Sequence, residues 1–130
     1  MIGGFILQGN AAKKVIIRAL GPSLAGAGVA EALQDPVLTL YNGTGDIVAT
    51  NDNWQNSPNK QAIIDSGLAP RNSHESAIVR TLAPGNYTAI VRGVKSTTGI
   101  GLLEVYDLAH ATGELQICLR GHASNPATRF

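Results

Sequence analysis

Residues 35–54, DPVLTLYNGTGDIVATNDNW, decide the fold class of this chain. Leucine alternates with threonine or tyrosine over residues 38–41, and this period of two is typical of a half-buried strand. Residues 42–45, Asn-Gly-Thr-Gly, tolerate the positive φ angles of a tight turn, and residues 46–50 return as a second strand. The stretch therefore predicts a β-hairpin that leads into a polar loop and the only tryptophan.

Further strands are predicted on both sides of the hairpin. They occupy residues 3–8, 14–20, 76–82, 86–94, 100–108 and 115–120, which are apolar or alternating runs separated by turn-forming residues. One short helix is expected after the hairpin, with Ser57 as its N-cap, Pro58 at its first position and Gly67 just past its end. Residues 24–33 are expected to form a long, irregular crossover with at most one helical turn.

Composition agrees with the strand pattern. Of the 130 residues, 44% are apolar and 15% are charged, and the 15 glycines suit strands and turns better than helices. The predicted elements indicate an all-β fold, an antiparallel and jelly-roll-like β-sandwich of about eight strands with one short helix. We expect residues 1–120 to form a single domain and residues 121–130 to be a C-terminal tail or a strand-donor segment.

Charge and hydropathy limit the partners to be expected. A net charge of +1 provides no electrostatic footprint for nucleic acid or an anionic membrane, and no apolar run is long enough for insertion into a bilayer. The N-terminus lacks the basic start and cleavage site of a signal peptide, so a secreted form would be a mature chain or an internal piece. Cys118 is the only cysteine and cannot form an intrachain disulfide.

We expect no enzyme. Catalysis would need a nucleophile with a base, a carboxylate pair or a metal site with an open position, and no such constellation stands out. Arg18, Arg80 and Arg92 each lie in mid-strand among apolar neighbours. They predict either cross-strand ion pairs or a basic platform for an acidic glycan.

The polar loop after the hairpin is the candidate ligand site. Asn51, Asp52 and Asn53 place oxygen-bearing side chains next to one another, and Ca²⁺ accepts six to eight such ligands in flexible geometry. The same residue types also close turns through their own hydrogen bonds, so both interpretations stay open. Tyr41 and Trp54 could form a sugar-stacking surface, although a single tryptophan beside a hairpin also serves to cap a core.

Three longer motifs point to a family. DPVLTLYNGTGDIVATNDNW, ESAIVRTLAPGNYTAIVRG and GIGLLEVYDL together resemble the β-sandwich repeats of bacterial secreted and cell-surface proteins that are related to the bacterial pre-peptidase C-terminal domain. The resemblance implies a non-catalytic appendage outside the cell, and some relatives bind calcium or matrix polymers. It also implies calcium-type positions at Asn51, Asp52 and Glu75, with Asn53 as a looser addition.

The two ends of the chain read as halves of one junction between tandem repeats. In such arrays, as the resemblance has it, a segment like residues 115–121 precedes the GGFI of the next unit. Since an exposed edge strand is a template for pairing with another chain, we expect strand addition between copies. The contact residues would be Ile2, Phe5 and Leu7 near one end, and Leu115, Ile117 and Leu119 near the other. A head-to-tail contact of this kind gives filaments or arrays unless it closes into a ring.

The sequence therefore predicts a structural and assembly domain, extracellular or at the cell surface, whose partners are copies of itself or adjoining domains. The alternative is a calcium-dependent accessory module that binds polysaccharide or another matrix polymer. Neither interpretation involves nucleic acid or insertion into a membrane.

Overall fold

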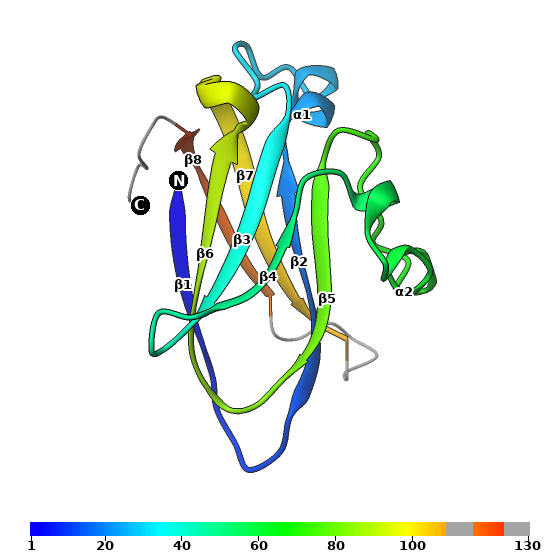
Figure 1. The fold of residues 1–130 in the computed structure, drawn as a ribbon. Helices are drawn as coiled ribbons and strands as arrows, with labels where there is room; N and C mark the ends of the chain where they lie inside the picture. The colour runs from blue at the N-terminus through cyan, green and yellow to red at the C-terminus, as the bar shows by residue number, and fades with distance from the viewer. Residues whose placement is uncertain (109–115, 124–130) are drawn as a thin grey trace.

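The structure is a computed structural model that describes residues 1–108 and 116–123. Its strands form two four-stranded antiparallel sheets that pack face to face (Figure 1). Sheet A has the order β1 (Ile2–Leu7), β6 (Gly85–Gly93), β3 (Pro36–Asn42), β4 (Ile47–Asn51). Sheet B has the order β5 (Ser76–Leu82), β2 (Lys13–Leu20), β7 (Gly99–Asp107), β8 (Gln116–Ala123). The predicted all-β sandwich is confirmed.

The strand pairing is that of a rolled antiparallel ribbon. β1 pairs with β6, β2 with β5 and β3 with β4, so the first six strands form nested pairs as in a jelly roll. β7 then adds to the free side of β2, and β8 adds to β7. The predicted hairpin is present as β3 and β4, with a register shift between Leu40 and Tyr41.

The main core lies between the sheets. Alternate side chains of each strand point inward, and Ile17, Leu38, Leu40 and Val91 are all within 1% of complete burial. Complete burial of a side chain of this size contributes roughly 1.5–3 kcal/mol. Phe5 of β1 stacks on Tyr87 of β6 at 5.5 Å between ring centroids, which ties the outermost strand of sheet A to the core.

A second, smaller core covers the outer face of sheet B. The segment after β4 folds over this face as η1 (Trp54–Asn56) and α2 (Lys60–Asp65). Trp54 and Ile63 from this segment pack against Ile16 of β2 and against Ala77 and Val79 of β5. The β4–β5 connection thereby removes from water a row of outward-facing strand residues that would otherwise be exposed.

The helix α2 begins later than predicted. Lys60 N–H donates to Ser57 O at 3.1 Å, so residues 57–60 form a turn with Pro58 at its second position. The Ser57 hydroxyl accepts from Asn59 N–H, and the N-cap is Asn59. The predicted N-cap at Ser57 is therefore wrong, because proline suits the second position of a turn as well as the first turn of a helix. Gly67 has a φ of 75° and follows the helix end, as expected.

The crossover between β2 and β3 contains α1 (Pro22–Gly26), which begins earlier than the single turn expected within residues 24–33. The rest of the crossover is irregular. At Leu33 its backbone passes close to two glycines, Gly21 and Gly99. A Cβ at Gly21 would lie 2.1 Å from Leu33 O, and one at Gly99 would lie 2.6 Å from Leu33 Cα. A side chain at either glycine would clash with the backbone of Leu33, so only glycine fits at these two positions. The close approach at Gly99 packs the crossover against the start of β7.

The largest difference at a strand end is in the C-terminal strand. β8 continues past the expected end at residue 120 to Ala123, so the first part of the predicted tail belongs to sheet B. A short helix, η2 (Val94–Ser96), joins β6 to β7. Among the described residues, no helix has the length and apolar character needed to cross a membrane.

Candidate functional site

Glu75, a predicted calcium ligand, is completely buried. Its carboxylate accepts hydrogen bonds from other segments of the same chain. Its Oε2 accepts from Gly21 N–H at 2.7 Å, from Ser23 N–H at 3.1 Å and from the Ser23 hydroxyl at 2.6 Å. Its Oε1 accepts from Asn72 N–H at 3.2 Å. Charge-assisted bonds of this kind are among the strong ones in proteins. The carboxylate therefore joins the start of the crossover to the loop before β5.

Asn51, at the end of β4, also uses its side chain within the fold. Its Oδ1 accepts from Ala77 N–H at 3.0 Å and its Nδ2 donates to Asn53 O at 3.1 Å. In the described part of the chain, the Oδ1 of Asn53 is buried and has no hydrogen-bond partner. No group of three or more His, Cys, Asp or Glu side chains suited to a metal is found within that part. Calcium binding stays a prediction, with Asn51 and Glu75 already engaged in hydrogen bonds.

Asp52, the remaining predicted ligand, lies beside Asp35. The β3–β4 register places Leu38 opposite Asn51, and thus brings the two ends of the hairpin together. Burial, the charge of Asp52 and a hydrogen bond between the two carboxyl groups raise the pKa of Asp35, while His74 acts in the opposite direction. Asp35 was not among the predicted ligands. The β3–β4 pairs end at Leu38 and Asn51, so Asp35 and Asp52 both lie beyond the hairpin ladder and the strand register does not pair them.

The two aromatic residues proposed for sugar stacking lie on opposite faces of the sandwich. Tyr41 is on the outer face of sheet A and is partly exposed. Trp54 is only 8% exposed within the second core, and its Nε1 donates to Asn72 O at 3.1 Å. The structure therefore does not bring them together, and Trp54 caps a core.

The three mid-strand arginines also lie apart. Arg18 forms an ion pair with Glu104, its cross-strand neighbour on β7, as one of the two interpretations predicted. Its guanidinium also donates to Leu68 O at 3.0 Å and lies 5.3 Å from the Tyr106 ring centroid. Arg92 is exposed on sheet A, and Arg80 lies at the edge of sheet B. They do not form one basic platform.

The sandwich has two sides where sheet edges come together. β4 ends sheet A and β5 ends sheet B on one side, while β1 and β8 end the sheets on the other side (Figure 1). We call these the β4/β5 side and the β1/β8 side. An edge strand presents unpaired N–H and C=O groups, which natural proteins cover, charge or interrupt.

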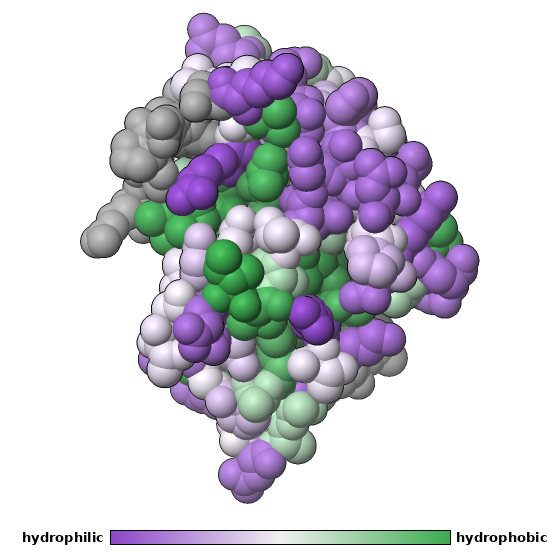
Figure 2. Space-filling model, viewed as in Figure 1, coloured by the Kyte–Doolittle hydropathy of each residue, from purple (hydrophilic) through white to green (hydrophobic). Residues whose placement is uncertain are grey.

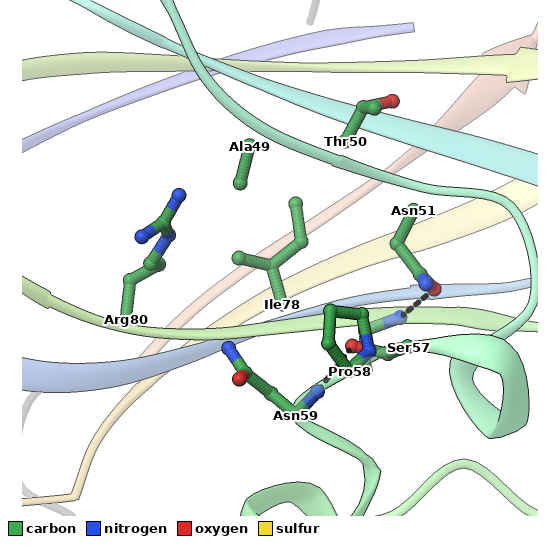
Figure 3. A pocket seen from close by; sticks show the side chains of 9 residues that line it. Ala49, Thr50, Asn51, Ser57, Pro58, Asn59, Ile78 and Arg80 are labelled. Atoms are coloured by element: carbon green, nitrogen blue, oxygen red, sulfur yellow. Dashed lines mark hydrogen bonds between the residues drawn. The ribbon is translucent and has the colours of Figure 1, made fainter.

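Side chains cover the backbone edges on the β4/β5 side. Figure 3 shows the hollow between these strands, about 290 Å³ in volume, with Asn51, Asn59 and Arg80 pointing toward it. Asn51 accepts from Ala77 N–H, Asn59 Nδ2 donates to Val79 O at 3.2 Å, and Arg80 donates to Val48 O at 2.7 Å. Edge groups of both sheets are thereby satisfied within the chain.

β1 has none of this protection within the described residues. It is paired with β6 over six consecutive residues without a bulge, and its sequence IGGFIL contains no charge and no proline. Its outward-facing residues are Ile2, Gly4 and Ile6, of which Ile6 is 58% exposed. Figure 2 shows hydrophobic atoms beside β1 and in the middle of the visible face. This is the type of edge that pairs with other strands.

The predicted partner-contact residues divide between edge and core. Phe5 and Leu7 point inward and are at most 5% exposed, so only Ile2 of the three β1 residues lies on the outer face. Ile117 and Leu119 lie in β8 and pair with Val105 and Leu103 of the same chain. Leu115 lies outside the described residues. Exposed Ile6 was absent from the prediction, because its position could only be judged once the direction of the pleat was known.

Compared with known proteins, the chain matches no protein-family model, no curated protein and no solved structure. The resemblance to repeats related to the pre-peptidase C-terminal domain rests on the quoted motifs.

Proposed function

We propose that the chain is a non-catalytic structural domain of an extracellular or cell-surface protein, and that it assembles with copies of itself or with adjoining domains by strand addition. The observation that supports this function best is the contrast between the two sides of the sandwich. Three side chains cover the β4/β5 side, whereas β1 is a regular, uncharged edge with an exposed isoleucine. The extracellular location rests on the resemblance alone.

The buried acidic groups fit a structural role. Glu75 receives four hydrogen bonds from backbone and serine donors, and Glu104 binds Arg18 and the Tyr106 hydroxyl. A general acid or base needs its carboxyl group within reach of a substrate, and these two carboxyl groups are turned toward the fold. We therefore propose that they stabilise the loops and strands they join.

The experiment is the mass of the purified chain in solution across a concentration series, with Ile6→Lys as the test variant. A lysine on an edge strand opposes pairing, so Ile6→Lys is expected to remain monomeric where the original chain assembles. Ile47→Lys is the matched control, because Ile47 is 63% exposed beside the β4/β5 side of the same sheet. Equal assembly of both variants would contradict the proposed role of β1.

The second candidate is a calcium-dependent module for polysaccharide or another matrix polymer. The observation that favours it is the proximity of Asp35 and Asp52, because a cation beside two carboxylates relieves their repulsion. Calcium added after chelation is then expected to raise the melting temperature of the chain but not that of Asp52→Asn. If calcium has no effect on the original chain, this candidate is rejected.

A further inference from the structure

The hydrogen bonds of β1 identify which backbone groups face outward. Met1 and Val91 exchange two backbone bonds, of 2.9 and 3.2 Å, and thus form a hydrogen-bonded pair with β6. Such pairs alternate along an antiparallel ladder. With the register of Ile2 opposite Ile90, the N–H and C=O groups of residues 3, 5 and 7 point toward β6. Those of Ile2, Gly4 and Ile6 point toward the open edge.

This set of outward-facing groups is symmetric about Gly4. If a second β1 lies antiparallel to the first with Gly4 opposite the partner's Gly4, then Ile2 lies opposite the partner's Ile6 and Ile6 opposite the partner's Ile2. Each of these facing residues has its N–H and C=O directed at the other strand, so every pair exchanges two hydrogen bonds. A displacement by one residue would place outward-facing groups opposite inward-facing ones.

The side chains also agree with this register. Ile2 and the partner's Ile6 would lie next to each other on the outer face, where cross-strand pairs of β-branched residues are favourable. β1 contains no ionisable side chain, so no like charges meet across the contact. Gly4, at the symmetric position, leaves the centre of the pairing open to close approach.

We infer that β1 pairs with β1 of a second copy of the chain about a two-fold axis at Gly4, joining the two A sheets into one eight-stranded sheet. The inference rests on the proposed function and specifies its contact. A two-fold contact uses the same surface on both subunits and therefore closes as a dimer. Growth beyond the dimer would need the other sheet edges.

Disulfide cross-linking tests the register. In a Cys118→Ser background, Gly4→Cys is expected to form a covalent dimer under mild oxidation, because Cα atoms in a hydrogen-bonded pair are about 5.5 Å apart. The substitution suits the fold, since a Cβ at Gly4 meets nothing closer than Tyr87 O at 3.7 Å. An equimolar mixture of Ile2→Cys and Ile6→Cys chains should cross-link, whereas each of these variants alone should not.

The outcomes separate the inference from the function. Cross-linking of Gly4→Cys, together with the mixed pair, supports the two-fold register. If the original chain assembles but Gly4→Cys gives no covalent dimer, the two-fold pairing is overturned while the assembly function stands. If the original chain is monomeric at every concentration, the two-fold pairing and the proposed assembly between copies are both overturned. Circular dichroism melts of each variant confirm that the cysteine chains retain the fold.

Discussion

At the scale of single residues, Glu75 shows how a side chain with metal-ligand chemistry can be used for structure. Its carboxylate receives four hydrogen bonds from the two loops that meet at the end of the sandwich. From the sequence, Glu75 is the loop residue that directly precedes a predicted strand at residues 76–82. Three of the four bonds come from Gly21 and Ser23, 54 and 52 residues earlier in the chain, so no local pattern could have identified these donors.

Glu75→Gln is expected to lower the free energy of unfolding by about 3 kcal/mol, because the amide nitrogen would face donors in a buried site. Ser23→Ala removes one of the four bonds and is expected to cost about 1 kcal/mol. Urea denaturation of both variants measures the difference. Equal stability of Glu75→Gln and the original chain would refute the structural role of this carboxylate.

The Asp35–Asp52 pair predicts a pH dependence. Burial first, and then the charge of Asp52, raise the pKa of Asp35 in the folded chain. An acid with a raised pKa contributes stability that is complete below its unfolded pKa of about 3.9 and is lost as pH rises through the folded value. Asp52→Asn should therefore raise the melting temperature at pH 7, and the gain should shrink toward pH 4.

Melting temperatures at these two pH values, in chelator, measure this effect. Asp65→Asn removes an exposed carboxylate from α2 and serves as the control for a simple change in net charge. A lower melting temperature of Asp52→Asn at pH 7 would contradict the assigned repulsion.

At the scale of elements, α2 packs against the outer face of sheet B and covers part of it. Ile63 is completely buried there, whereas its neighbour Ile64 is 45% exposed. Ile63→Ala is therefore expected to destabilise the fold by about 3 kcal/mol. Ile64→Ala on the same helix should cost less than about 1 kcal/mol, since most of its lost contacts are with water. Chemical denaturation distinguishes these values, and similar costs would show that α2 does not pack as described.

Asn51 is the corresponding test of the β4/β5 side. Asn51→Ala leaves the buried N–H of Ala77 without an acceptor and should cost about 2 kcal/mol. Asn56→Ala, an exposed asparagine in η1, is the matched control and should change stability by less than about 0.5 kcal/mol. If both changes are equally mild in urea denaturation, Asn51 does not cover this edge.

The elements themselves were largely predictable, because period-two alternation and turn residues mark strands directly. The start of α2 was not, since Pro58 is suited to two different local structures and only the Lys60 to Ser57 hydrogen bond distinguishes them. The order of strands within the sheets also could not be predicted from local pattern. The exposed edge at β1 depends on that order, and so do the separate positions of Tyr41 and Trp54.

At the scale of the whole molecule, the sandwich is asymmetric about its core. One side is closed by side chains from β4, β5 and the connection between them. On the other side sheet A ends in β1, which no side chain of residues 1–108 and 116–123 covers in this way. The proposed assembly follows from this asymmetry, because covered edges discourage pairing and regular edges invite it. Of the two edges of sheet A, β1 is therefore the one at which we expect another strand to add, rather than β4.

The most direct test of strand addition at β1 is backbone amide hydrogen exchange, resolved by residue, across a concentration series. The amides of Gly4 and Ile6 face the open edge, whereas those of Phe5 and Leu7 face β6. We expect Phe5 and Leu7 to be protected at every concentration, and Gly4 and Ile6 to become protected only as concentration rises. Rapid exchange of Gly4 and Ile6 at every concentration would contradict strand addition at β1.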